Sequence, residues 1–143
     1  MFQNCENLKI IDISNFDTSQ VTNMTGLFSY CKSLKSLNLE KFNTEKVTDM
    51  SKMFQYCTDI KKLDLLNFKT NKVKDMSNMF QYCLSISILD LSILNTSSVR
   101  DISQMFENCG KLSILKILNF DTSSVTSMWR MFQYCTKYRN FKF

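Results

Sequence analysis

Residues 34–59 read LKSLNLEKFNTEKVTDMSKMFQYCTD, and residues 60–85 repeat the pattern as IKKLDLLNFKTNKVKDMSNMFQYCLS. The register holds over the whole chain of 143 residues, because each of the six cysteines follows the previous one by 26 residues. They are Cys5, Cys31, Cys57, Cys83, Cys109 and Cys135. A period of roughly 20–50 residues is typical of a solenoid, in which each unit packs on its neighbours. We therefore expect one repeat domain over residues 1–143, with about five and a half units.

Other residue types keep the same period. One column holds only phenylalanine, and three others hold valine, threonine and a large apolar residue. The columns are Phe2, Phe28, Phe54, Phe80, Phe106 and Phe132; Val21, Val47, Val73, Val99 and Val125; Thr18, Thr44, Thr70, Thr96 and Thr122; and Phe16, Phe42, Phe68, Leu94 and Phe120. We interpret the Phe and Met columns as core, and we expect the Thr hydroxyls to bond to backbone at a turn.

Each unit begins with a pattern that suits a short strand. Leu37 and Leu39 alternate with polar Asn38, which predicts one buried and one exposed face. The equivalent apolar triads are Leu8/Ile11/Ile13, Leu34/Leu37/Leu39, Ile60/Leu63/Leu65, Ile86/Leu89/Leu91 and Leu112/Leu115/Ile117. Stacked units would join these strands into a parallel sheet.

The second half of the unit predicts a short helix. Met50, Met53, Phe54 and Cys57 are apolar at i, i+3, i+4 and i+7. Asp49 precedes them, where a carboxylate can cap a helix. The equivalent N-cap positions are Asn23, Asp75, Asp101 and Ser127. Helices need about 8–10 Å between axes and strands about 4.8 Å, so we expect an α/β solenoid that curves with the sheet inside.

The LxxLxL pattern of residues 34–39 resembles leucine-rich repeats. The longer pattern, LDLLNFKT at residues 63–70 and VKDMSNMFQYC at residues 73–83, resembles the BspA-like bacterial surface repeats, which include mycoplasma lipoprotein repeats of unknown function. It departs from ordinary leucine-rich repeats where they carry a buried Asn column, because this chain has Phe42 and Phe68 there. The resemblance implies a protein of the cell surface or extracellular space with a role in adhesion or host interaction.

The cysteines are the most tempting chemical feature. No close CxxC pair that would favour zinc is present. Helices 8–10 Å apart would also keep the thiols beyond the Cα separation of about 7 Å that a disulfide tolerates. We therefore predict a column of small buried thiols rather than a disulfide ladder or a metal site.

The sequence contains nothing that indicates an enzyme. It has no His to activate a Cys nucleophile, and it has no GxSxG, P-loop or GxGxxG motif. The cysteines and hydroxyl residues also recur in every unit, whereas an active site is a single arrangement. We predict a non-enzymatic protein with no catalytic residues, no metal and no cofactor.

The polar residues of the strands are the candidate binding residues. Asp12, Asn38, Asp64, Asp90 and Lys116 lie between buried leucines and must point away from the core, with Lys35 and Lys61 beside them. We predict that they line the concave face and bind a protein or glycan ligand. Asp64 and Asp90 would be neighbouring like charges, which favours a cation or basic group between them. A merely solvated face is the alternative.

Three functions stay open. The chain is a surface protein that binds a ligand on its sheet, a structural spacer, or a cytosolic interaction scaffold, which unpaired cysteines would favour. The net charge of +5 includes a cluster at Lys61, Lys62, Lys69, Lys72 and Lys74, but Asp64 and Asp75 interrupt it, so we predict no nucleic-acid binding. No segment reaches the roughly 18 apolar residues of a membrane span, and no signal peptide is visible.

The ends of the chain predict self-association. The chain starts inside a unit and stops with Tyr138, Phe141 and Phe143 at LxxLxL positions. A solenoid end without a polar cap exposes its core. We expect a piece of a longer array that associates end to end.

Overall fold

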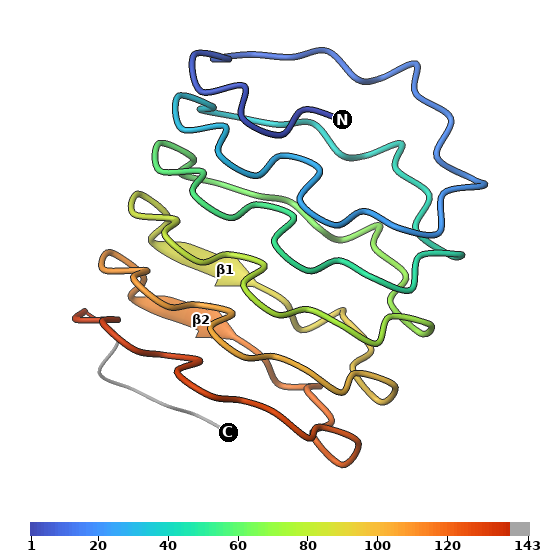
Figure 1. The fold of residues 1–143 in the computed structure, drawn as a ribbon, viewed down its shortest axis with the longest axis vertical. Helices are drawn as coiled ribbons and strands as arrows, with labels where there is room; N and C mark the ends of the chain where they lie inside the picture. The colour runs from blue at the N-terminus through green and yellow to red at the C-terminus, as the bar shows by residue number, and fades with distance from the viewer. Residues whose placement is uncertain (138–143) are drawn as a thin grey trace.

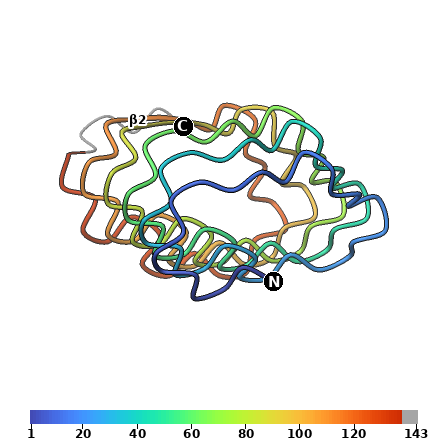
Figure 2. The same cartoon turned by 90° about the horizontal axis from the view of Figure 1, so that it is seen from above.

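The computed structural model describes residues 1–137 as a stack of similar coils (Figure 1). Within this range it contains two strands, β1 (Ile88–Asp90) and β2 (Ile114–Lys116), which pair in parallel and in register. Seen from above, the coils are flattened loops, each slightly displaced from the one before (Figure 2). The predicted solenoid is therefore correct. Tyr138, Phe141 and Phe143 lie outside the described residues.

The predicted strands are only partly present. Among residues 1–137, strand geometry is reached at two of the five apolar triads, those that include Leu89 and Leu115. The other triads follow the same path, and one backbone bond of 3.2 Å joins Lys35 N to Lys9 O. We refer to the exposed side of these five segments as the strand face.

The prediction of one helix per unit is wrong. Residues 50–57 form consecutive turns, with bonds from Met53 N to Met50 O (3.3 Å) and from Cys57 N to Phe54 O (3.1 Å). Lys52 and Tyr56 have φ of 59° and 58°. A positive φ at the third residue of a turn is typical of type II geometry, and it ends any helix. We call residues 49–57 and their equivalents the turn segment.

The backbone of the turn segment bonds to the next coil instead of to itself. Alternate N–H groups of Met50, Lys52, Phe54 and Tyr56 donate to carbonyl oxygens 25 residues later, at 2.8–3.0 Å. The same pattern recurs along the described stack. A helix would direct these groups to the residue four positions back, so the two structures compete for the same donors. The ladder between coils satisfies them.

The predicted N-cap residues have a different role. Asp49 Oδ1 accepts the backbone N–H of Ser51 at 2.8 Å, which makes an Asx turn at the start of the turn segment. Asn23, Asp75 and Asp101 do the same. These positions also form parallel β-bridges between neighbouring coils, in a series that begins at Asn23 and ends at Ser127.

Replacing the helix by this ladder removes the predicted cause of curvature. A stack of coils curves in this way only if one side of each coil is about twice as thick as the other. Backbone hydrogen bonds instead join neighbouring coils on the turn-segment side as well as between β1 and β2. Between β1 and β2 and along the turn segments, neighbouring coils therefore lie at the spacing of a β-ladder, and the difference in thickness that would make the strand face concave is absent there.

The core consists of continuous side-chain columns. The rings of Phe2, Phe28, Phe54, Phe80, Phe106 and Phe132 stack with centroids 5.4–5.8 Å apart. Met50, Met53, Phe54 and Cys57 are fully buried, as the helix pattern predicted, although the backbone is not helical. Consecutive turns therefore bury the same positions that a helix would.

The threonine column bonds to backbone, as predicted. Thr44 Oγ1 donates to Lys69 O at 3.0 Å and accepts Lys69 N–H at 2.8 Å. Thr18 and Thr96 make the same pair of bonds one coil on. Each hydroxyl thus satisfies both backbone groups of one residue in the next coil.

A buried amide column runs beside the Phe column. Gln55 Nε2 donates to Gln81 Oε1, and Gln81 Nε2 donates to Glu107 Oε2, each at 2.5 Å. Glu107 is buried and has no N–H to pass on. The next oxygen, Gln133 Oε1, is buried and has no hydrogen-bond partner among residues 1–137. One carboxylate therefore interrupts the column.

Candidate binding face

The polar residues of the strand face point away from the core, as predicted, with Asp12, Asn38, Asp64 and Lys116 exposed and Asp90 half-buried. The oxygens of the four acidic and amide side chains already accept hydrogen bonds. Asp12, Asn38, Asp64 and Asp90 each accept the backbone N–H two residues later, at 2.9–3.1 Å. Each side chain therefore holds a turn at the end of its segment. Alternation along the strands predicts that these side chains point outward, whereas the turn that each one holds was not predicted.

Lys116 neutralises Asp90 from the coil on the side away from Asp64, so it is not a cation between the two carboxylates. Its Nζ lies 2.9 Å from Asp90 Oδ2 in the preceding coil. The hydroxyl of Ser92, the bond to Lys116 and the Ser92 N–H lower the pKa of Asp90 from 3.8 to about 2. The ion pair with Lys116 offsets the charge of Asp90 and so weakens the predicted repulsion between Asp64 and Asp90 without a ligand. Asp64 has no ion-pair partner within residues 1–137.

Two surface hollows adjoin at Asp64 and Leu66, and Leu66 is 64% exposed. Their volumes are about 300 and 330 Å³. The first is lined by Leu37, Asn38, Leu39, Glu40, Asp64, Leu66 and Asn67, and the second by Lys62, Leu63, Asp64, Leu65, Leu66, Ile88 and Asp90. Three of the predicted site residues, Asn38, Asp64 and Asp90, therefore border hollows.

Exposed apolar residues on this face were missed by the sequence analysis. Leu66 and Leu118 share one column, and Ile88 and Ile114 share another. The signal was available, because each stands outside the alternation that buries the LxL leucines. Apolar side chains rimmed by polar groups are typical of interaction surfaces.

Lys35 and Lys61 are exposed at the same position of neighbouring coils. Neither forms an ion pair with residues 1–137. The basic cluster around Lys61 does not act as one patch, since Lys69 and Lys72 line a separate hollow of about 260 Å³ with Glu45, and Lys69 pairs with Glu45.

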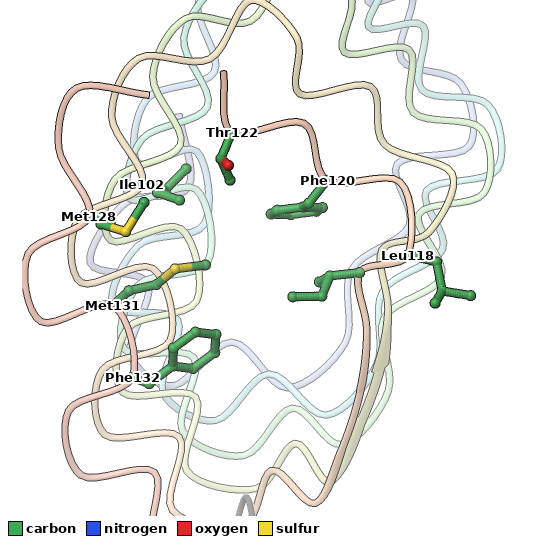
Figure 3. Close-up of a pocket in the computed structure, with 8 residues that line it drawn as sticks. Ile102, Leu118, Phe120, Thr122, Met128, Met131 and Phe132 are labelled. Carbon is green, nitrogen blue, oxygen red and sulfur yellow. The ribbon is translucent and has the colours of Figure 1, made fainter. Parts of the chain in front are cut away.

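A cavity of about 400 Å³ lies in the interior of the last described coil (Figure 3). It is lined by Ile102, Ile117, Leu118, Phe120, Thr122, Met128, Met131 and Phe132. Met128 is 54% exposed, whereas its equivalent Met76 is 0% exposed because another coil covers it. This cavity is the uncovered end of the core.

The cysteine column is buried, as predicted, for a partly different reason. Four thiols are fully buried and unpaired, and Cys57 Sγ donates to Phe28 O of the preceding coil at 3.2 Å. Cys31, Cys83, Cys109 and Cys135 make the same bond. The predicted helix spacing does not exist, so burial and these bonds explain the column instead.

Burial also determines the chemistry of the thiols. It raises the pKa of Cys31 and Cys135 to about 11 and that of Cys57, Cys83 and Cys109 in the same direction. A protonated thiol is a poor nucleophile. Within residues 1–137, no three Cys, Asp or Glu side chains group as a metal site, and no helix is long and apolar enough to cross a membrane.

The family model described as "Mycoplasma protein of unknown function, DUF285" matches residues 1–111 and again residues 85–141. The chain belongs to the DUF285 family. This confirms the resemblance to the mycoplasma repeats. A comparison with curated proteins found none that is significantly similar in sequence.

Two solved structures are similar to this DUF285 chain. One is a leucine-rich cell surface protein from Faecalibacterium prausnitzii, with a TM-score of 0.53 and 17% identity over 83% of this chain and 35% of that one. The other is a leucine-rich repeat protein from T. pallidum, with a TM-score of 0.48 and 16% identity over 85% of this chain and 63% of that one. The first similarity shows a leucine-rich-repeat-like fold. The chain spans about a third of the length of that protein.

Proposed function

We propose that this DUF285 chain is a binding segment of a cell-surface repeat protein, and that its strand face contacts a protein or glycan ligand without catalysis. The observation that carries the proposal is the pair of hollows that meet at Asp64 and Leu66. An exposed apolar side chain beside a carboxylate that forms no ion pair with residues 1–137 provides both an anchor and a charge for recognition. The structural similarity to a protein described as a cell surface protein supports the location.

The leading alternative is a spacer that only projects other domains. A spacer needs the columns of the core but has no use for Leu66, which is 64% exposed. Exposed apolar area lowers solubility, so its presence beside a hollow favours a contact surface.

The test replaces hollow residues by residues that the same columns already hold. Asp64→Asn follows Asn38 and keeps the acceptor of the turn, and Leu66→Ser follows Ser14 and Ser92. A matched control, Asp59→Asn with Leu84→Thr, removes the same charge and a similar apolar side chain outside the hollows.

Peptides selected from a phage-displayed library and glycans selected on an array serve as probes, and their binding is measured by calorimetry. We expect the Asp64→Asn/Leu66→Ser variant to bind about tenfold or more weakly, as for a buried anchor, and the control to bind normally. Equal binding to both variants, or no selected ligand, contradicts the proposal and favours the spacer.

A further inference from the structure

Three lysines occupy the same position of three successive coils at one border of the strand face. They are Lys9, Lys35 and Lys61, and all three are exposed. The bond of 3.2 Å from Lys35 N to Lys9 O places the first two on adjacent backbones. The coils that carry Lys35 and Lys61 are joined nearby, since Asp59 N, two residues before Lys61, donates to Lys32 O at 3.1 Å. Three successive coils therefore carry one positive charge each at the same position, and the backbones of Lys9 and Lys35 lie at about the 4.8 Å of a β-ladder. We call these residues the lysine row.

The lysine row is not neutralised within residues 1–137. The three ion pairs of that part of the chain use Lys32, Lys69 and Lys116 instead. Lys62 adds a fourth exposed cation beside Lys61. The nearest carboxylate in sequence, Asp59, is exposed and makes no ion pair with the described residues. Like charges on adjacent strands destabilise a sheet, so this arrangement favours an external anion.

The carboxylates of the strand face lie apart from the lysine row. Asp12 and Asp64 lie three residues after Lys9 and Lys61, which corresponds to about 10 Å of extended chain. Asp90 lies three residues after Ser87, which has the position of the lysines in its coil. Their carboxylates accept backbone N–H groups of their own turns. The strand face thus has a basic border and a separate acidic strip.

We propose that the lysine row binds a linear anionic polysaccharide laid along the axis of the solenoid, across the strands. This rests on the proposed function, because it assigns a ligand class to the same face. A row one residue wide matches a linear chain of charges better than a planar membrane surface. The neighbouring positions hold Ile10, Ser36 and Lys62, so the row lacks the aromatic side chains on which single-stranded nucleic acids stack.

The test compares two variants that each lose three positive charges. Lys9→Gln/Lys35→Gln/Lys61→Gln removes the lysine row, and Lys52→Gln/Lys74→Gln/Lys111→Gln removes three exposed lysines elsewhere. Heparin is the sulfated probe, with uncharged dextran, single-stranded DNA and phosphatidylserine vesicles as comparisons. Circular dichroism verifies that both variants fold.

We expect the row variant to bind heparin about tenfold more weakly at low salt, with the slope of log Kd against log salt reduced by about two, as counterion release predicts for three lost contacts. The control variant stays within about threefold of the parent, since its lysines are scattered. Dextran does not bind.

Equal losses in both variants, or none, overturn the proposal, as does DNA or vesicle binding that is as tight and depends on the same lysines. The variant Asp64→Asn/Leu66→Ser separates this result from the proposed function. If that variant loses its selected ligands while the lysine row proves irrelevant to heparin, the strand face binds a ligand but not this polyanion.

Discussion

Substituting Lys52 by Gly distinguishes the turn segment from a helix, because the two structures predict opposite signs. Lys52 is exposed and has a φ of 59°. An L-residue in this left-handed region costs about 1–2 kcal/mol, whereas the extra freedom of Gly in the unfolded chain costs about 0.5–1 kcal/mol. Lys52→Gly should therefore raise the free energy of unfolding by about 0.5–1 kcal/mol. In a helix interior the same change would lower it by about 1 kcal/mol.

Lys41→Gly is the matched control. Lys41 is also an exposed lysine at the third position of a turn, closed by the 2.9 Å bond from Phe42 N to Leu39 O, but its φ is not positive. Lys41→Gly should lower the free energy of unfolding by about 0.5–1 kcal/mol. Urea titration measures the free energy of unfolding of both variants, provided that the m-value is unchanged. In thermal melting, the Tm of Lys52→Gly should rise by about 2–4 °C. A loss of stability in Lys52→Gly equal to that of Lys41→Gly would refute the turn geometry.

Four further predictions concern the columns and the strand face. Glu107→Gln restores the missing amide donor of the buried column and should stabilise the protein by about 1–3 kcal/mol in urea titration, and no gain would mean that the column is already satisfied. Thr44→Val leaves both backbone groups of Lys69 without a partner and should cost about 2–3 kcal/mol, so a neutral effect contradicts the role of the hydroxyl. The pKa of Asp90 is lowered to about 2, so the unfolded chain binds more protons below about pH 4. The part of the unfolding free energy that depends on Asp90 should then fall between about pH 4 and pH 2, and Asp90→Asn should flatten that fall. Cys5 is exposed and should react with a thiol reagent before the buried cysteines, which should react only on unfolding, so equal rates would contradict their burial.

The sequence was sufficient to predict the columns, because they depend only on the period. Equivalent residues of a solenoid must meet. Once the six cysteines establish the 26-residue period, the period also determines which residues form each of the remaining columns. The roles of Thr44 and Cys57 also followed from general chemistry, since a hydroxyl at a turn bonds to backbone and a small thiol is readily buried.

The backbone of the turn segment could not be derived from burial alone. Type II turns in succession bury Met50, Met53, Phe54 and Cys57 just as a helix would, so the apolar pattern does not distinguish them. A weaker signal was present in the two columns with positive φ. Gly26 and Asn78 occupy one and Asn4 and Asn108 the other, and these residue types tolerate the left-handed region best.

The outward orientation of the polar strand residues could be predicted from the sequence, but the hollows beside them could not. Alternation along the strands places Asp64 and Asp90 outside the core. The pairing of Lys116 with Asp90 also follows from the repeat, because they share a column in adjacent coils. The hollows around Leu66 do not follow, since they depend on how large and small exposed side chains alternate between neighbouring coils.

The backbone bonds between coils also have a consequence for how such a chain can change in length. Each coil meets the next through the same donors and acceptors, so a chain that gained or lost one complete unit would rebuild an equivalent junction. Adding a single residue inside the turn segment would instead shift every later donor out of step with its acceptor. Duplication of whole units is therefore structurally cheap for this architecture, whereas small insertions in that segment are not.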